Sequence, residues 1–472
     1  MKIKEHILIV GAGLCGSLLT LRLAQRGYMV TLIEKRPDLR QVEQDAGRSI
    51  NLALSDRGLR GLRLAGIDSE AKKLCIPMHG RMIHDRQGNT FLSKYSGRSN
   101  EYINSISRPG LNMLLLDAAE QMSNVEIIFN HGCKSVDLEN ASGTFKNYST
   151  GKEVNYSADI LIGTDGAGSS VRKSMFNHKK FLFSFSQQWL THGYKELEIP
   201  ATKEGKYRAD KGALHIWPRG EDMLIALPNL DGSFTVTLFL PYSNSEYCFD
   251  KLTTADSVLS YFKKEFPDAL TLMPNLAEQF FANPTGPLGT IKCSPWNCYG
   301  KSLIMGDAAH AIVPFYGQGM NASFEDVVVF DEILESFEGK ENGSTNWNTV
   351  FSEYEKNRLK DTNAIADLAV DNFHEMKEHT ASELFQKKRK LEMSFEAEFP
   401  MDYYSKYSLV TFNEKITYEE ALKRGRAQDK AILNLIDDGK LTEEMSLEEK
   451  LAIVKKETKD VLHDDAVVRN LK

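Results

Sequence analysis

The chain has 472 residues, of which 42% are apolar and 26% charged, and its formal net charge is −7. Such a composition is typical of a globular protein long enough for about two to three domains. An acidic balance without a long basic stripe argues against nucleic-acid binding. No apolar run approaches the roughly 20 residues of a membrane-spanning helix, and a first predicted strand at His6 leaves no room for a signal peptide. We therefore expect a cytoplasmic protein without a membrane anchor.

In the N-terminal third, apolar patterns alternate between strands and helices. "HILIVGAG" predicts a strand, residues 18–26 a helix, and "YMVTLIEKR" a second strand, which together make a βαβ unit. A strand-to-helix transition follows over 49–66, and then a hairpin whose turn lies at 86–89. A further helix is predicted over 110–121, and the chain returns to strands over 125–140.

The later segments change character twice. Residues 158–175 predict a strand, a loop and a helix. The stretch 212–241 alternates apolar and polar residues between Gly, Asp and Asn turns, which predicts an antiparallel sheet in a second domain. Residues 301–311 return to a strand and a helix that we expect to rejoin the first domain, and the chain beyond residue 320 is largely helical and charged.

Six cysteines are scattered through the chain, at positions 15, 75, 133, 248, 293 and 298. Their irregular spacing predicts reduced thiols. The one close pair, Cys293 and Cys298, is predicted to lie in a surface loop, because a metal site would need more ligands nearby.

Gly11-Ala12-Gly13-Leu14-Cys15-Gly16 is a G-x-G-x-x-G motif that follows a predicted strand and opens a predicted helix. Gly11 allows a tight turn, Gly13 lets the backbone approach a pyrophosphate, and Gly16 lets the helix pack closely on the strand. The helix start offers N–H groups and a positive dipole to phosphates. Glu34, 18 residues after Gly16 at the end of the second strand, suits an adenosine ribose and would repel a 2′-phosphate. The motif therefore predicts a site for FAD or NAD rather than NADP.

Two further strand ends pair an acid with a glycine. Asp165-Gly166 is either a turn with an Asp helix cap or a loop shared by flavin and nicotinamide binding. Asp307 can accept hydrogen bonds from the ribityl chain of a flavin, or from a nicotinamide ribose. The glycine-rich turn 317–319 leads into a helix, whose first amides could face the pyrimidine edge of an isoalloxazine.

These three strand ends together resemble those of the single-component FAD-dependent aromatic hydroxylases. The similarity spans roughly residues 5–430 and is greatest to the kynurenine-hydroxylating members of that family. It rests on "GRSINLALSDRG" (47–58), "GRMIH" (80–84), "HGYKELEIP" (192–200), "HIWPRG" (215–220), "MLIALPN…DGSFTVTLFLP" (223–241) and "GDAAHAIVPFYGQGMNASFED" (306–326).

The resemblance implies an α/β fold in three parts. A Rossmann-like FAD-binding domain would comprise residues 1–180 and 290–330, with a mainly antiparallel-sheet substrate domain inserted at 181–289. A helical region would complete the chain at 331–472. Eukaryotic members of the family end in an apolar membrane anchor, whereas this chain ends in a charged pattern, so a cytoplasmic enzyme of the bacterial type is expected.

The resemblance also implies a reaction. NADPH would reduce bound FAD, O2 would add to the reduced flavin as a C4a-hydroperoxide, and its distal oxygen would convert L-kynurenine to 3-hydroxy-L-kynurenine. The cofactor carries the chemistry, while the protein orients the ring and excludes water. Hence no catalytic side chain and no metal is expected, and NADPH would bind without a Rossmann domain of its own. The oligomeric state is left open.

Site residues follow from the resemblance position by position. Arg81 and Tyr95 would hold the substrate carboxylate, for which a guanidinium fork is suited, and Asn372 and Tyr407 would add polar contacts. The predicted walls of the aromatic pocket are Leu214, Met223, Ile225, Phe239, Pro314 and Phe315. The predicted cofactor-binding positions are Gly11, Gly13, Leu14, Gly16, Glu34, Lys35, Arg36, Ala53, Arg108, Asp165, Asp307, Gly319, Met320 and Asn321.

Several of these residues have a plainer interpretation. Without the resemblance, Arg81 is a solvated charge in a hairpin and Tyr95 an ordinary amphipathic surface residue. Ile225 and Phe239, spaced for one face of a strand, would simply face the core. His310 could act as a base, but a structural role is favoured.

Other functions stay open. A hydroxylase of another aromatic acid is the nearest alternative, and it would lack the carboxylate-binding role of Arg81 and Tyr95. A flavin halogenase is disfavoured because no W-x-W-x-I-P-like segment is present. A flavin-binding redox sensor would show little turnover of NADPH.

Overall fold

The computed structural model describes residues 4–42, 51–338, 345–378 and 383–470, except for the side chains of 374, 376–378 and 464–470. The chain divides into two compact units. The first unit comprises Met1–Cys75, Ser105–Leu190 and Gly286–Ala366, and the second Ile76–Asn104, Thr191–Thr285 and Asp367–Lys472.

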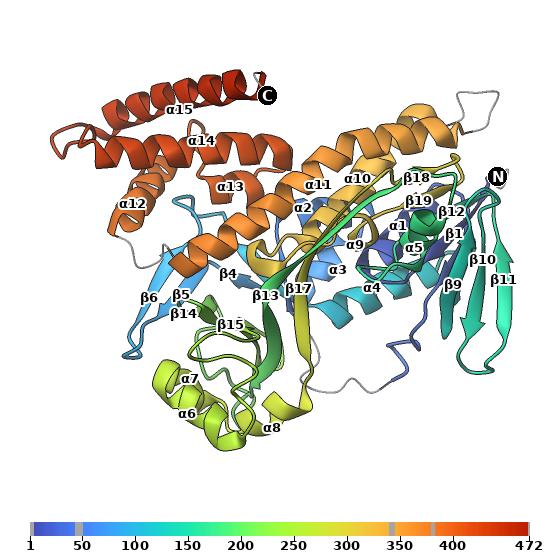
Figure 1. Ribbon diagram of the computed structural model, residues 1–472, viewed down its shortest axis with the longest axis horizontal. Helices are drawn as coiled ribbons and strands as arrows, with labels where there is room; N and C mark the ends of the chain where they lie inside the picture. The colour runs from blue at the N-terminus through green and yellow to red at the C-terminus, as the bar shows by residue number, and fades with distance from the viewer. Residues whose placement is uncertain (1–3, 43–50, 339–344, 379–382, 471–472) are drawn as a thin grey trace. The chain divides into compact units, whose positions relative to one another are not determined.

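A six-stranded sheet organises the first unit (Figure 1). In sheet order its strands are β18 (Asn297–Cys298), β19 (Ser302–Ile304), β12 (Ile160–Gly163), β1 (His6–Val10), β2 (Met29–Ile33) and β8 (Val125–Ile128). All neighbours pair in parallel except β18, which is antiparallel to β19. Because parallel strands end at one edge of a sheet, the segments that follow β1, β12 and β19 lie together. The prediction that residues 301–311 rejoin the first sheet is confirmed.

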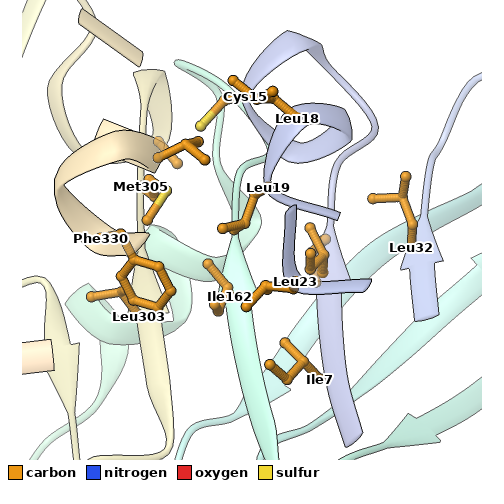
Figure 2. Packing of buried hydrophobic residues seen from close by; sticks show 14 of the residues in the cluster. Ile7, Cys15, Leu18, Leu19, Leu23, Leu32, Ile162, Leu303, Met305 and Phe330 are labelled. Carbon is orange, nitrogen blue, oxygen red and sulfur yellow. The ribbon is translucent and has the colours of Figure 1, made fainter. Parts of the chain in front are cut away.

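The helices α1 (Leu14–Gln25), α4 (Arg108–Glu120) and α10 (Gly319–Phe337) share an apolar core with this sheet. Figure 2 shows how α1 packs its leucines, among them Leu19 and Leu23, near Ile162 of β12 and Phe330 of α10. Each of these side chains is at most 1% exposed. Burial of one such side chain contributes about 1.5–3 kcal/mol, so the interface of α1 with the sheet anchors the glycine loop between them.

Smaller elements complete the first unit. A three-stranded antiparallel sheet has the order β11 (Glu153–Ser157), β10 (Ser142–Asn147), β9 (His131–Asp137). The remaining elements are β3 (Asn51–Leu54), α2 (Asp56–Leu64), α3 (Asp68–Lys73), α5 (Ser170–Asn177), α9 (Asp307–His310) and the 3-10 helix η1 (Pro314–Tyr316), and β4 (Cys75–Met78) and β7 (Ile103–Ser107) run across the unit boundary.

A seven-stranded sheet is the framework of the second unit. Its order is β17 (Thr285–Ser294), β13 (Ser184–Ile199), β16 (Phe234–Pro241), β15 (Asp222–Pro228), β14 (Leu214–Arg219), β5 (Gly80–His84) and β6 (Thr90–Lys94), of which β13 and β17 continue into the first unit. The predicted antiparallel strands β14, β15 and β16 and the β5–β6 hairpin are confirmed. Apolar side chains of this sheet pack against the helices α6 (Ala255–Glu265), α7 (Pro267–Leu272) and α8 (Leu276–Ala282).

The C-terminal region is helical, as predicted (Figure 1, orange to red). It consists of α11 (Trp347–Glu378), which crosses the unit boundary, α12 (Glu383–Glu398), α13 (Lys406–Thr411), α14 (Tyr418–Asp437) and α15 (Leu447–Asn470). Ser405 and Thr417 cap α13 and α14 through their hydroxyls, and an apolar cluster that includes Phe395 and Ile432 joins α12 to α14. Among the described residues, no helix is long and apolar enough to cross a membrane.

The prediction of a surface loop at Cys293 and Cys298 is wrong. Cys293 lies in β17 and Cys298 in β18, and they are 5% and 0% exposed. Trp296 lies between them, donates its indole N–H to the Cys293 carbonyl, and contacts the Tyr354 ring. The segment is buried because β18 pairs with β19 at the sheet edge and an aromatic cluster covers it.

The three-part domain assignment and the two units divide the chain on different grounds. The units are defined by packing, whereas the predicted boundaries follow the change of sequence pattern and the family resemblance. The predicted boundaries stay a prediction.

Candidate cofactor and substrate site

The glycine loop after β1 has two glycines required by packing and one that faces open space. A Cβ at Gly11, where φ is +106°, would lie 2.7 Å from the Cα of Asp165. A Cβ at Gly16 would lie 2.0 Å from the Gly11 carbonyl oxygen. No atom lies within 4 Å of a Cβ built at Gly13. Gly13 is the N-cap residue of α1, and because glycine has no side chain, it makes no side-chain hydrogen bond to the helix start. The backbone at Gly13 is thus open to a ligand at the start of a helix, which is the arrangement that a pyrophosphate requires.

Two polar side chains that the sequence motif does not contain support this loop. Thr164 donates its hydroxyl to the Gly11 carbonyl at 2.8 Å, and Asn112 donates its amide to the Ala12 carbonyl at 3.1 Å. They lie 153 and 100 residues along the chain from their partners. No local pattern connects such distant positions, so the sequence could not identify these residues.

Glu34 ends β2 beside the same loop. Its carboxylate accepts hydrogen bonds from the Ala12 backbone N–H at 2.8 Å and from the Arg36 guanidinium at 2.7 Å. Glu34 is 6% exposed, whereas Lys35 and Arg36 are exposed. Leu14, in the first turn of α1, is buried. The carboxylate also accepts from the Arg36 backbone N–H at 3.1 Å. It thus ties the glycine loop to β2 and keeps an oxygen lone pair beyond these three bonds.

Asp165 follows β12, and its carboxylate binds the start of α5. This contact agrees with the first of the two interpretations, a turn with an Asp helix cap. The Oδ2 of Asp165 accepts hydrogen bonds from the backbone N–H groups of Ser170 and Val171 at 2.6 and 3.3 Å. Its Oδ1 is buried without a hydrogen-bond partner among the described residues. Burial raises the pKa of the carboxyl above its ordinary value. An orphaned acceptor of this kind, next to the glycine loop, fits a hydroxyl of a bound nucleotide.

Asp307 begins α9 after Gly306, whose φ is +63°. Burial raises the pKa of the Asp307 carboxyl, and the nearby charges of Arg108 and His310 act in the opposite direction. Among the described residues, none donates a hydrogen bond to the Asp307 carboxylate. Arg108, the first residue of α4, is exposed. Because the Arg108 charge lowers the pKa of Asp307, these two predicted cofactor residues lie close enough to interact electrostatically.

The turn before α10 brings together further predicted cofactor residues. Asn321 accepts a hydrogen bond from the Ser55 N–H at 3.0 Å and donates its amide to the carbonyls of Ala53 and Gly317, both at 2.9 Å. Gly317 has a φ of +67°, and a Cβ there would lie 3.1 Å from the Ala53 Cβ. Gly319 and Met320 begin α10 directly beside Asn321. The Asn321 side chain is therefore fixed to the β3–α2 segment.

His310 is part of a buried ionic network. Its Nε2 lies 2.6 Å from Asp326, whose other oxygen accepts from Arg358 at 2.8 Å. Arg358 also binds Glu325, which pairs with Arg57 at 2.6 Å. Burial opposes ionisation of Asp326, yet His310 and Arg358 hold its pKa below the ordinary value. These bonds favour the structural interpretation of His310.

In the second unit, Arg81 lies against two tyrosine rings. Its guanidinium carbon is 4.9 Å from the centroid of the Tyr407 ring and 5.6 Å from that of Tyr95, and the two rings stack 5.3 Å apart. Tyr95 is 2% exposed, and its hydroxyl is buried without a hydrogen-bond partner among the described residues. Burial and the neighbouring Tyr407 raise the pKa of Tyr95, while the Arg81 charge lowers it. The cluster therefore combines a fixed cation with an unsatisfied buried hydroxyl.

The apolar residues predicted for the pocket lie on the same sheet face as Arg81. Leu214 pairs with Arg81, and Met223 pairs with Phe239. Because side chains alternate along a strand, Ile225 shares the face of Met223. The opposite face carries Trp217, Leu224 and Leu238, which pack against α6–α8.

The other predicted substrate residues are distributed over both units. Asn372 is a buried residue of α11 in the second unit. Pro314 and Phe315 form part of η1 in the first unit.

Comparisons with known proteins agree with this geometry. The family model described as "FAD binding domain" matches residues 4–187 and 292–368. The kynurenine 3-monooxygenase of Myxococcus xanthus is 42% identical over 452 residues, which cover 96% of this chain and 95% of that protein. The enzyme of the same name from Dictyostelium discoideum is 44% identical over 92% of this chain and 94% of its own length.

Solved structures of more distant proteins share the fold. The tetrameric form of 2-methyl-3-hydroxypyridine-5-carboxylic acid oxygenase matches with a TM-score of 0.64 at 20% identity, covering 84% of this chain and 96% of that one. Pseudomonas aeruginosa PqsL matches with a TM-score of 0.63 at 15% identity, over 82% and 99% of the two chains.

The fold, the glycine loop and the matched family model define an FAD-dependent monooxygenase. Within that class, the chain belongs to the kynurenine 3-monooxygenase family, since relatives above 40% identity align over more than nine-tenths of its length.

Proposed function

We propose that this chain hydroxylates L-kynurenine to 3-hydroxy-L-kynurenine, with NADPH and O2 as co-substrates and FAD as the bound cofactor. The observation that carries the substrate assignment is the cluster of Arg81, Tyr95 and Tyr407, in which a guanidinium and an orphaned buried hydroxyl converge. An amino-acid carboxylate would bring a charge opposite to that of the guanidinium, and hydrogen-bond acceptors for the Tyr95 hydroxyl. Family membership supports the same substrate.

The residues of the first unit fit FAD. The open backbone at Gly13 and the start of α1 suit the pyrophosphate, and Glu34 suits the adenosine ribose. Asp307 would accept a hydroxyl of the ribityl chain, and the start of α10 would stabilise negative charge on the pyrimidine edge. When bound, FAD supplies the electron transfer and the oxygen activation that no side chain can provide. The proposed holding residues are Gly11, Gly13, Leu14, Gly16, Glu34, Lys35, Arg36, Ala53, Arg108, Asp165, Asp307, Gly319, Met320 and Asn321.

The side chains of the second unit would bind and orient the substrate. Arg81 would pair with the carboxylate, and the Tyr95 hydroxyl would donate a hydrogen bond to it. Tyr407 and Asn372 would complete the polar contacts. Fixing the amino-acid end leaves the aromatic ring one orientation relative to the apolar walls, so a single ring carbon is presented for hydroxylation.

The proposed apolar walls would exclude water from the reacting ring. Leu214, Met223, Ile225 and Phe239 share one sheet face with Arg81. Pro314 and Phe315, in η1 of the first unit, stay predicted pocket residues. Water must be excluded from this pocket, because it would divert activated oxygen into hydrogen peroxide. This assignment keeps the predicted division into an FAD-binding domain (1–180 and 290–330), a substrate domain (181–289) and a helical C-terminal region. A cytoplasmic location stays a prediction.

A substrate panel tests the proposal against its nearest rival. The FAD-loaded protein is incubated with NADPH and, in separate reactions, L-kynurenine, 4-hydroxybenzoate and salicylate. We expect hydroxylated product from L-kynurenine alone. Efficient hydroxylation of one of the simple aromatic acids, without turnover of L-kynurenine, would favour the hydroxylase of another acid instead.

A further inference from the structure

The buried carboxylate of Glu396, on α12, connects two segments that are far apart in the chain. Its Oε2 accepts a hydrogen bond from the Gly97 backbone N–H at 3.1 Å, and its Oε1 accepts from the Ser405 backbone N–H at 2.8 Å. The Glu396 side chain is 0% exposed. Burial disfavours the charged form, but the hydrogen bonds hold the pKa of Glu396 below its ordinary value. An ionised carboxylate therefore joins the segment after β6 to the start of α13.

Each of these two N–H groups lies two residues from a tyrosine of the Arg81 cluster. Tyr95 precedes Gly97 by two residues, and Tyr407 follows Ser405 by two. Ser405 caps α13 by accepting a hydrogen bond from the Ser408 N–H, so Tyr407 lies in a fixed first helical turn. The two rings stack 5.3 Å apart with an interplanar angle of 10°, and the Glu396 carboxylate is bonded to the backbone two residues from each of them.

Close packing leaves this connection little freedom. A Cβ at Gly97 would lie 2.3 Å from the Met393 carbonyl oxygen and 2.7 Å from the Ala397 nitrogen, so the backbone of 97 touches the backbone of α12. Arg98 lies 3.4 Å from Glu396 Oε1 and donates to the Pro400 carbonyl. The guanidinium balances the buried charge and holds the α12–α13 turn in place.

We infer that Glu396 is a positioning residue for the substrate carboxylate, acting through the stacked rings of Tyr95 and Tyr407 that contact Arg81. The inference rests on the proposed function and adds a residue that does not itself touch the substrate. Loss of the Glu396 carboxylate removes the direct connection between the Gly97 and Ser405 backbones, so the spacing of the tyrosine rings and the orientation of Arg81 become less fixed. Only ligands that carry a carboxylate depend on that orientation.

The test compares two ligands on FAD-loaded protein. Dissociation constants are measured from the flavin spectrum for L-kynurenine and for kynuramine, which lacks the carboxylate, with wild-type protein and with Glu396→Gln. We expect Glu396→Gln to weaken L-kynurenine about tenfold, as loss of about one hydrogen bond would, and to change kynuramine by less than about twofold. The rate at saturating L-kynurenine should change far less than KM. Glu398→Gln, an exposed acid two residues further on the same helix, is the control and should leave both ligands unchanged.

Two further variants keep the inference falsifiable. Glu396→Asp keeps the charge and shortens the side chain, so it should give the same selective loss if Glu396→Gln does not fold. In an Arg81→Ala background, Glu396→Gln should add little to the loss of L-kynurenine affinity, because the two residues act on one contact. Equal weakening of both ligands, or unchanged L-kynurenine affinity in a folded variant, would overturn the inference and leave the proposed function standing. Wild-type protein that binds no L-kynurenine would refute the proposed function and this inference with it.

Discussion

The guanidinium carbon of Arg81 lies 4.9 Å from the centroid of the Tyr407 ring. The cross-strand neighbours of Arg81 are Leu214 on β14 and Ser93 on β6. A cation held against an aromatic face has a restricted orientation. Tyr95 stacks on Tyr407, and its ring centroid lies 5.6 Å from the same guanidinium carbon. This arrangement gives the proposed substrate a fixed point at its amino-acid end.

Replacement of Arg81 should separate binding from chemistry. Arg81→Ala removes a charged, two-pronged donor, so the KM for L-kynurenine should rise by roughly 30-fold to 100-fold, the equivalent of about 2–3 kcal/mol. The rate at saturation should fall much less. Arg81→Lys keeps the charge but not the fork and should be intermediate. Steady-state kinetics measures all three, and an unchanged KM in Arg81→Ala would remove the residue from the site.

Tyr95→Phe should weaken the substrate without weakening the fold. The Tyr95 hydroxyl is buried without a well-formed hydrogen bond in the described part of the chain, although the Arg81 guanidinium lies near it. Its removal should therefore change Tm little. Affinity for L-kynurenine should fall about tenfold. Tyr403→Phe is the matched control, because that hydroxyl donates to Glu392 at 3.4 Å. A lower Tm in Tyr95→Phe with unchanged affinity would contradict the account.

Two glycine substitutions should have opposite consequences. Gly13→Ala adds a methyl group where no atom lies within 4 Å, so the protein should fold normally but bind FAD more weakly. Gly16→Ala places a methyl group 2.0 Å from a backbone carbonyl oxygen and should destabilise the cofactor-free protein by about 1–3 kcal/mol. Thermal unfolding without FAD and titration with FAD distinguish the two effects. If Gly13→Ala binds FAD as the wild type does, the pyrophosphate does not approach this position.

Much of this molecule is predictable from local pattern. The βαβ unit, the β5–β6 hairpin and the antiparallel β14–β16 strands follow from apolar periodicity and turn residues, which act over a few positions. The glycine loop is predictable for the same reason, since its three glycines and the helix start are adjacent in sequence.

Contacts between distant segments are not predictable in this way. Cys298 is buried because β18 pairs with β19 and because it belongs to the same apolar cluster as Trp296 and Tyr354. The local spacing of Cys293 and Cys298 shows neither contact and therefore predicted a surface loop. Glu396 looks like any acid on a charged helix until folding places it between Gly97 and Ser405. Thr164 and Asn112 support the glycine loop from other elements.

Asp222 should make stability depend on pH. Burial raises the pKa of this carboxyl to about 7, against an ordinary value of 3.8. A raised pKa means that the folded state binds the proton more tightly, so the contribution is full below pH 3.8 and is lost as pH rises through about 7. Asp222→Asn removes the buried charge, so its Tm should exceed that of the wild type at pH 8 and match it near pH 4.

The raised pKa of Asp222 also limits how large the stability gain of Asp222→Asn can be. A shift of about three pKa units corresponds to at most about 4 kcal/mol at pH 8. Tyr261 donates to the Asp222 carboxylate at 3.0 Å, and the asparagine carbonyl can still accept that bond. Glu204→Gln, an exposed acid of the same unit, should show no such pH dependence. A difference between Asp222→Asn and wild type that stays constant from pH 4 to pH 8 would exclude titration of Asp222 as the cause.

The stoichiometry of NADPH oxidation tests the central claim most directly. With FAD-loaded protein, L-kynurenine and O2, the account predicts that NADPH consumption is strongly stimulated by L-kynurenine and yields one 3-hydroxy-L-kynurenine for each NADPH oxidised. NADPH consumption that ignores L-kynurenine, or that yields only hydrogen peroxide, would contradict it.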